Sequence, residues 1–268
     1  MSNYFHGYTE KEFNRLVEQS SFLGPDIYQN LHIPKSGTLL EIGCGVGAQT
    51  RILTRVSPDL KICCLDRNPD QIQLVQNWLN ENAQLSEQIQ LVCTEFLEWN
   101  AEKQFDAAFI CWVLEHVPDP ASFIKHAAQQ LHSGASIHIT EVQNSSLYLH
   151  PSNPAIENYW KAYCRRQEQL NGDPNVGAKL RNWLFDAGFE HIDIQAHLML
   201  RDRTEPEELR LMMEYWWELM ESVGDSMQDE GLISRSERDA AHEAIQHFHL
   251  HPDACFYYTF VQAEARKI

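Results

Sequence analysis

The chain has 268 residues, 43% of them apolar, and its 21 basic and 38 acidic side chains give a formal net charge of -17. Binding to nucleic acid depends on clustered lysines and arginines, so this excess of acid argues against a nucleic-acid partner. No apolar run approaches the ~20 residues that cross a bilayer, and the first residues lack the basic and apolar regions of a signal peptide. The seven cysteines lie mostly in apolar stretches, so we expect reduced thiols and a cytoplasmic location.

Residues 1–34 form the first predicted element, an amphipathic helical segment outside the core fold. Thr9 to Glu12 have the pattern of a capping box, and Gly24-Pro25 ends the helix. Such a helix either packs on the core or closes over a bound molecule as a lid. In the second case Tyr8 and Gln19 would reach that molecule.

An apolar run over residues 38–42 leads directly into a turn with glycines at positions 43, 45 and 47. This pattern predicts a nucleotide-binding turn between a strand and a helix, because glycine permits a tight turn and a close approach of the backbone to a ligand. Gly43-x-Gly45-x-x-Ala48 also satisfies the fingerprint of dinucleotide-binding folds. Glu41 would repel a pyrophosphate at the helix N-terminus, and it favours a ligand with positive groups.

The next two predicted strands each end close to an acid. Residues 61–66 end in Asp66, at the spacing from the glycine turn that suits a carboxylate binding ribose hydroxyls. The neighbouring Arg67 leaves a 2′-phosphate open as an alternative. Residues 90–96 contain Glu95.

These segments, together with those that follow, resemble the class I S-adenosylmethionine-dependent methyltransferases. The first motif of that family, E/D-x-G-x-G-x-G, matches residues 41–47. After a fourth strand over 105–111, the segment 112–120 (WVLEHVPDP) is similar to the part of the family that lies beneath the sulfonium. Residues 131–141 resemble its "L-x-P-G-G" element, with Ser133 and Ala135 in place of the usual proline and second glycine, and the resemblance continues more weakly over 176–200.

The resemblance implies an α/β fold with a doubly wound, seven-stranded Rossmann-like sheet whose last strand is antiparallel. We place the sixth strand near 190–200 and the seventh near 255–265. The chain then divides into an N-terminal helical lid (1–34), an S-adenosylmethionine-binding core (35–143), a cap insertion (144–175), a core segment with a helix and the sixth strand (176–203), a helical cap insertion (204–252) and the seventh strand (253–268).

The resemblance also implies a set of residues that contact S-adenosylmethionine. Asp66 would bind both ribose hydroxyls, Glu95 would take the adenine amino group, and the following backbone N–H would meet a ring nitrogen. The whole expected set is Tyr8, Gln19, Glu41, Gly43, Cys44, Gly45, Gly47, Asp66, Arg67, Gln71, Glu95, Phe96, Cys111 and Trp112.

Methyl transfer from a sulfonium asks the protein for alignment, exclusion of water and, for some acceptors, a proton acceptor. His116 is the best-placed histidine, as a general base or as a structural residue on the adenine side. Glu141 is a second catalytic candidate, with His6 and His150 behind it. We expect no metal site, because the alternating histidines 247, 249 and 251 have no identifiable acidic or cysteine partner and Pro252 breaks the strand.

The two cap insertions read as helical, and the second is strongly periodic. Three roles are open for the aromatic and sulfur side chains of these insertions: the lining of an apolar pocket, the core of the cap itself, or a homodimer face. These side chains are Tyr148, Tyr159, Trp160, Tyr163, Met212, Met213, Tyr215, Trp216, Trp217 and Met220.

The sequence therefore predicts a methyltransferase that methylates an oxygen or nitrogen of a small, partly apolar molecule. The alternatives are an NAD-dependent oxidoreductase and a non-catalytic binding module with the methyltransferase fold.

Overall fold

The computed structural model describes residues 5, 15–16, 22–25, 27–28 and 31–268. Residues 15–16, 22–25 and 27–28 are helical. Helical backbone therefore includes Gly24 and Pro25, where we predicted the first helix to end. The predicted capping box at Thr9 lies outside the described residues.

One sheet organises the described chain, with the strand order β3-β2-β1-β4-β5-β8-β6 and with β7 paired to β8. Neighbouring strands from β3 to β5 are parallel, and β8 is antiparallel to β5. The predicted α/β fold with an antiparallel last strand is thus confirmed. The strands are β1 (Ser36–Ile42), β2 (Asp59–Asp66), β3 (Ile89–Cys93), β4 (Phe105–Cys111), β5 (Leu131–Val142), β6 (Tyr148–His150), β7 (Phe189–Asp202) and β8 (Cys255–Lys267).

The sheet of the described chain has eight strands where we predicted seven. The additional strand is the short β6, which lies inside the segment that we predicted to be a helical insertion. Three residues give too little alternation for a pattern to reveal a strand. β6 forms because β8 extends beyond β5 and offers it free backbone groups, which pair with residues 148–150.

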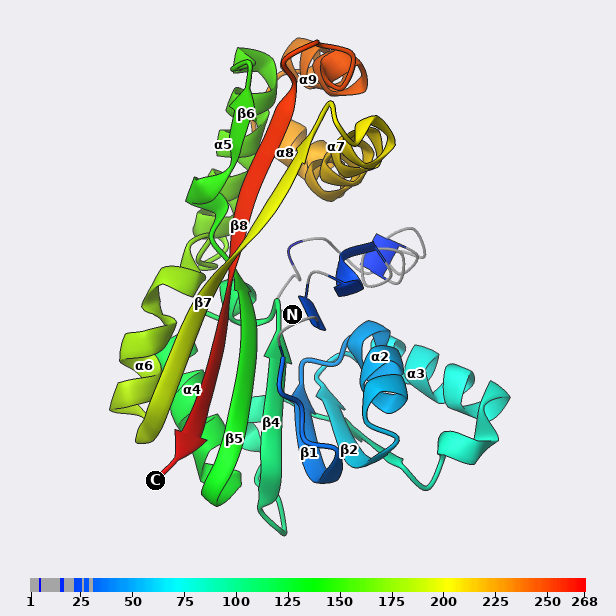
Figure 1. The fold of residues 1–268 in the computed structure, drawn as a ribbon, viewed down its shortest axis with the longest axis vertical. Helices are drawn as coiled ribbons and strands as arrows, with labels where there is room; N and C mark the ends of the chain where they lie inside the picture. Colours follow the sequence, from blue (N-terminus) through cyan, green and yellow to red (C-terminus); the bar gives the residue numbers. More distant parts are fainter. Residues whose placement is uncertain (1–4, 6–14, 17–21, 26, 29–30) are drawn as a thin grey trace.

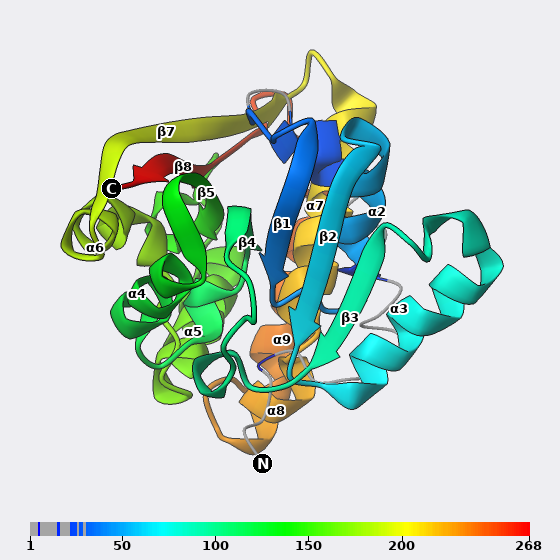
Figure 2. The ribbon, with the colours of Figure 1, turned by 90° about the horizontal axis from the view of Figure 1, so that it is seen from below.

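Helices cover both faces of the sheet and build a cap at one end (Figures 1 and 2). The α-helices are α2 (Ala48–Val56), α3 (Pro69–Glu81), α4 (Pro120–Gln129), α5 (Pro154–Gln169), α6 (Leu180–Asp186), α7 (Pro206–Glu221), α8 (Gly224–Asp229) and α9 (Arg235–Phe248). Short 3₁₀ turns link them at 83–85, 96–98, 114–116, 144–146 and 176–179.

The second half of β1 is buried on both sides of the sheet. Leu39 packs into the cluster formed with α2 and α3, whereas Leu40 packs into the cluster formed with α4 and α6. Successive side chains of a strand point to opposite faces, so each helical layer receives alternate residues. This two-sided burial fixes the register and leaves the carboxyl ends of β1, β2 and β4 free to carry a site.

β7 and β8 are longer than their neighbours and run from the core into the cap (Figure 1). The lower part of β8, residues 260–266, pairs with β5, and the upper part, residues 255–257, pairs with β6. The face that carries Phe256, Tyr258 and Phe260 packs against α5, α7 and α9 in a separate apolar cluster. The cap is therefore built on the same strands that complete the core sheet.

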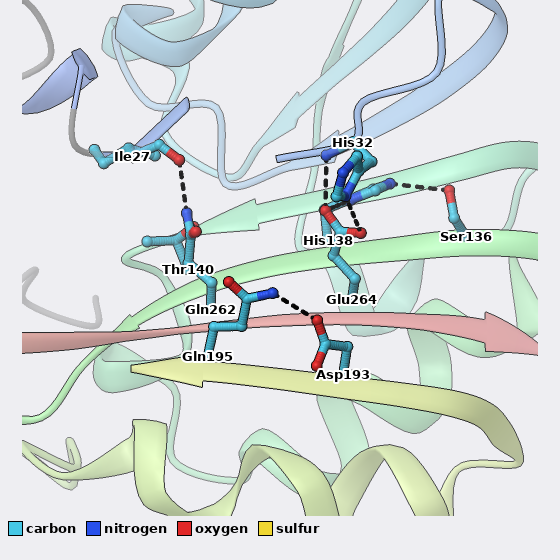
Figure 3. Close-up of polar contacts among 9 residues, drawn as sticks. All are labelled: Ile27, His32, Ser136, His138, Thr140, Asp193, Gln195, Gln262 and Glu264. Atoms are coloured by element: carbon cyan, nitrogen blue, oxygen red, sulfur yellow. Dashed lines mark hydrogen bonds and ion pairs between the residues drawn. The ribbon is translucent and has the colours of Figure 1, made fainter. Parts of the chain in front are cut away.

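The N-terminal segment is attached to the polar face of β5 and β8 (Figure 3). Gln262 donates a hydrogen bond of 2.8 Å to the carbonyl of Ile27. Glu264 accepts from the backbone N–H of His32 at 2.8 Å, and its carboxylate also lies 3.4 Å from the Nδ1 of His138. These contacts fix where the chain enters the core.

Among the residues that the structure describes, no helix is both long and apolar enough to cross a membrane. Within the same residues no group of three or more His, Cys, Asp or Glu side chains has an arrangement that could hold a metal ion.

Candidate active site

A cavity of about 430 Å³ lies between the carboxyl ends of the core strands and the cap. The core contributes the glycine turn, the ends of β2 and β4 and the loops that follow β3 and β4. The cap contributes side chains of α5, α7, β7 and β8, while Arg15, Leu16 and Leu23 come from the N-terminal segment. Ligands of open α/β sheets bind at this end of the strands.

Gly45 leaves the floor of the cavity open. It has a φ of 54°, and a Cβ added there would have only the Oε1 of Gln71, at 3.6 Å, within 4 Å. Gly43 serves a different purpose, because a Cβ there would approach the Cγ2 of Val113 to 2.6 Å. The first glycine thus lets the turn pack on the loop after β4, and the second leaves room for a ligand.

Asp66 is held rigidly at the end of β2. Its Oδ2 accepts the N–H of Gly45 and its Oδ1 accepts the N–H of Asn68, both at 2.9 Å. Burial raises the pKa of this carboxyl, although both backbone bonds oppose the rise. A carboxylate has about four acceptor positions, so two remain for hydroxyl groups of a ligand in the cavity.

Arg67 and Glu95 form the rim beside Asp66. Arg67 Nη1 lies 3.5 Å from Glu95 Oε2, and both side chains are about two-fifths exposed. Because this guanidinium is already paired with a carboxylate, the contact lends no support to the 2′-phosphate alternative. Phe96 is buried beneath the rim against Phe123 and closes the cavity on this side.

Trp112 sits at the end of β4 in a left-handed conformation, with a φ of 54°. Non-glycine residues rarely adopt this conformation, and they cluster at functional sites when the surroundings hold them there. Glu141 of β5 supplies the restraint, because its Oε1 accepts the N–H of Val113 at 2.9 Å and of Leu114 at 2.6 Å. Glu141 is fully buried and is absent from the cavity lining, so its geometry suits holding this turn.

Glu41 is also turned away from the cavity lining. Its Oε2 accepts the hydroxyl of Thr50 at 2.7 Å and lies 3.4 Å from the thiol of Cys64. Burial raises its pKa to about 7. The expected contact between Glu41 and the cofactor stays a prediction, and the structure gives this carboxyl a partner in α2.

Glu115 and His116 follow β4 and both line the cavity. Burial raises the pKa of Glu115 to about 7, against the hydrogen bond from Gln167 and the charge of Arg15. Burial, helped by the charges of Arg15 and Arg67, lowers the pKa of His116 to about 3. The imidazole is therefore neutral at physiological pH and a weak base.

The cap half of the cavity is aromatic. Trp160 stacks on Tyr163 with ring centroids 4.9 Å apart, and Trp216 meets Tyr258 edge-on at 4.7 Å. Trp216 is 3% exposed, and its Nε1 has no hydrogen-bond partner among the described residues. The remaining cap residues of the lining are Asn144, Met199, Tyr215 and Leu219, and Val142 at the end of β5 lies beside them in the lining.

The structure brings most of the predicted site residues together. The cavity is lined by Gly43, Cys44, Gly45, Asp66, Arg67, Gln71, Glu95, Phe96, Cys111, Trp112 and His116. Glu41, Gly47 and Glu141 are not among its lining residues, and a Cβ at Gly47 would instead contact Val75. Tyr8, Gln19 and His6 lie outside the described residues, and His150 is exposed on β6.

Pattern reasoning missed several lining residues. Asn144, Met199 and Tyr258 come from three elements far apart in sequence, and none of them stands in a motif. The aromatic and sulfur side chains of the cap have two different locations. The cavity is lined by Trp160, Tyr163, Tyr215 and Trp216, whereas the core of the cap contains Tyr159, Met212, Met213 and Met220. Tyr148 is exposed.

The fold and the cavity define a Rossmann-like α/β domain whose cavity is lined by a glycine turn on one side and by aromatic side chains on the other. A family model described as "Methyltransferase domain" matches residues 8–194. The chain belongs to this methyltransferase family, and the predicted membership of the class I S-adenosylmethionine-dependent methyltransferases is confirmed.

Similar proteins agree with this family. The chain is 31% identical over 126 residues to a mitochondrial ubiquinone biosynthesis O-methyltransferase of Dictyostelium discoideum, a match that covers 44% of this chain and 39% of that protein. It is 24% identical over 166 residues to the ubiquinone biosynthesis O-methyltransferase of Xanthomonas axonopodis pv. citri, with 62% of this chain and 67% of that protein covered. The chain thus spans less than half of the first relative.

Among solved structures, the phosphoethanolamine N-methyltransferase 2 of Haemonchus contortus in complex with S-adenosyl-L-methionine matches with a TM-score of 0.61. The match covers 97% of this chain and 57% of that chain at 14% identity. At this identity the comparison shows the fold alone.

Proposed function

We propose that the chain transfers the methyl group of S-adenosylmethionine to an oxygen or nitrogen of a small, largely apolar molecule held under the cap. One observation carries the proposal: a single cavity is lined both by the glycine turn with Asp66 and by the aromatic side chains of α5, α7 and β8. A methyl donor and an acceptor could therefore meet in one water-poor space.

The residues fit this cofactor. The open space over Gly45 accommodates a ligand close to the backbone, and Asp66 presents free acceptor positions to ribose hydroxyls. Bound S-adenosylmethionine supplies an electrophilic methyl group on a positively charged sulfur. The chain then has to orient the acceptor, exclude water and receive a proton where the acceptor loses one.

The composition of the cap supports the class of acceptor. Tyr163, Tyr215 and Trp216 offer flat apolar faces, and the Nε1–H of Trp216 offers a hydrogen bond to an acceptor oxygen. The relatives named O-methyltransferases support oxygen as the atom methylated. The net charge of -17 supports an enzyme without a nucleic-acid partner. The position of the cysteines in apolar stretches supports a cytoplasmic location.

The N-terminal segment is proposed as a lid, because Arg15, Leu16 and Leu23 line the cavity, while Gln262 and Glu264 of β8 hold the end of the segment at Ile27 and His32. Removal of residues 1–20 should raise the Kd for S-adenosylmethionine while the sheet stays folded. An unchanged Kd in the folded truncation would exclude the lid and, with it, Tyr8 and Gln19 as cofactor contacts.

The function is tested by binding and by turnover. Melting temperature is measured with S-adenosylmethionine, S-adenosylhomocysteine or NAD, and we expect only the first two to raise it. Transfer of a labelled methyl group from S-adenosylmethionine to a panel of phenols and arylamines then tests catalysis. Stabilisation by NAD alone would refute the proposal. Binding of S-adenosylmethionine without transfer to any tested acceptor would favour the binding-module alternative, and sedimentation would decide whether the chain is a homodimer.

A further inference from the structure

A chain of buried hydrogen bonds links the cap to the end of β4. Tyr258 donates to Asn144 Oδ1 at 2.9 Å, Asn144 Nδ2 donates to Gln167 Oε1 at 3.4 Å, and Gln167 Nε2 donates to Glu115 Oε2 at 2.7 Å. All four residues are at most 6% exposed. Because each amide donates in the same direction, the chain ends in a donor that favours the ionised form of Glu115.

Glu115 lies at the boundary between the two halves of the cavity. It lies two residues after Val113, which meets the glycine turn at Gly43, and it interacts with Tyr163 and Tyr258 of the cap. Its Oε2 is bonded to Gln167, whereas its Oε1 has His116 Nε2 at 3.7 Å and no hydrogen bond among the described residues. One oxygen is therefore held and the other is available to a ligand.

The groups around Glu115 come from every neighbouring element. Arg15 is the positive charge near it in the described N-terminal segment. The other titratable groups that interact with it are His116 beside it, Cys111 of β4, Glu141 of β5, Tyr163 and Cys164 of α5, and Tyr258 of β8. A buried carboxyl amid mostly neutral groups, on the wall of a cavity, is costly for stability and typical of a functional acid or base.

We propose that Glu115 is the general base of the reaction and that Gln167 is its positioning residue. The inference rests on the proposed function and requires an acceptor that carries a proton on the attacking atom. For a hydroxyl acceptor, the oxygen forms a bond to the methyl carbon, the carbon–sulfur bond breaks with its electron pair left on sulfur, and the hydroxyl proton passes to Glu115 Oε1. Solvent then removes that proton when the product leaves.

His116 does not take this role. Its pKa of about 3 makes it a poor proton acceptor, and no titration of His116 falls near neutral pH. Glu115 matches the task better, because a carboxyl that ionises close to pH 7 is largely available as a base and still accepts a proton readily. The rate should therefore rise with pH as Glu115 loses its proton and reach a plateau above that range.

The test uses the full chain, tritiated S-adenosylmethionine and two phenols of different acidity. 4-Ethylphenol keeps its proton until about pH 10, as tyrosine does, whereas 4-nitrophenol ionises near neutrality and needs little help. Glu115→Gln should lower kcat for 4-ethylphenol by roughly 100-fold or more and remove the rise with pH. The decrease in kcat of the same variant with 4-nitrophenol should be much smaller, and the KM for each phenol should change little.

Two variants sharpen the result. Gln167→Leu removes the donor to Glu115 and should move the rise in kcat to higher pH, while a purely structural role of Gln167 would leave its midpoint in place. Glu221→Gln is the control, since this carboxylate pairs with Tyr159 and Arg238 in the cap and is absent from the cavity lining, and it should keep the rise at the wild-type pH.

The proposal is overturned if Glu115→Gln retains the pH dependence or loses the same factor with both phenols. It is also overturned if neither phenol is methylated although the wild-type chain binds S-adenosylmethionine and methylates arylamines, which would leave the proposed function standing. Failure of the wild-type chain to bind S-adenosylmethionine at all would instead refute the proposed function. Circular dichroism and melting temperature confirm that each variant is folded.

Discussion

Replacement of Asp66 by alanine should separate cofactor binding from folding. In the folded chain this carboxylate accepts the N–H of Gly45 and of Asn68, both at 2.9 Å. Loss of those two bonds costs about 1–2 kcal/mol of folding stability if water replaces the carboxylate. The effect on binding is larger, because hydrogen bonds from ribose hydroxyls to a charged acceptor contribute about 1.5–3 kcal/mol each.

Two such bonds correspond to a loss of roughly 100-fold or more in affinity for S-adenosylmethionine. Calorimetric titration with S-adenosylmethionine and S-adenosylhomocysteine measures this loss, and melting temperature without ligand measures the cost to the fold. Asp70→Ala is the matched control, because Asp70 lies four residues away in the first turn of α3 and is absent from the cavity lining. Affinity within twofold of wild type in a folded Asp66→Ala chain would remove Asp66 from the binding site.

Three further predictions concern the glycine turn, the N-terminal attachment and the cap. Gly45→Ala should weaken S-adenosylmethionine binding by at least 10-fold through occupied space, with a φ of 54° adding about 1 kcal/mol of strain; unchanged calorimetric affinity would contradict this. Hydrogen bonds from His138 and His32 outweigh burial and lower the pKa of Glu264 to about 2. The free energy of unfolding of the wild type should therefore exceed that of Glu264→Gln by ~1–2 kcal/mol near neutral pH. Urea titrations should show this difference disappearing as the pH falls from about 4.5 towards 2. Met212→Ala should cost about 2–5 kcal/mol because this side chain is fully buried in the cap, and a smaller change in denaturant midpoint would show that the cap unfolds separately.

The cofactor half of the site could be predicted because its residues follow one another at the ends of successive strands. Gly45, Asp66 and Glu95 are each close in sequence to an apolar run, and parallel strands bring their carboxyl ends to one edge. The same logic placed His116 at the cavity. It could not show that its ring is buried near Arg15 and Arg67, which decides its protonation.

The acceptor half could not be predicted in this way. Trp160, Trp216 and Tyr258 come from α5, α7 and β8, and their convergence depends on how far β7 and β8 extend beyond the core. Helical periodicity identified which faces are apolar, but an apolar face gives the same pattern whether it meets another helix or a cavity. Glu41 is a second example of what the sequence could not predict. The sequence indicates that a carboxylate precedes the glycine turn, but it does not indicate the direction in which that side chain points.

The two halves of the cavity are joined at Glu115, for which the sequence predicted no catalytic role. Glu115 is placed by β4, as the cofactor residues are, and burial raises the pKa of its carboxyl. The hydrogen bond from Gln167 of α5 opposes that rise, and Asn144 and Tyr258 of β8 continue the same hydrogen-bond chain. A change in the cap can therefore alter the reactivity of the core without touching the cofactor. Tyr258→Phe provides the measure of this coupling: it removes the last donor, leaves the aromatic wall intact, and should shift the pH dependence of methyl transfer in the same direction as Gln167→Leu but by less, because two amides lie between the hydroxyl and the carboxylate.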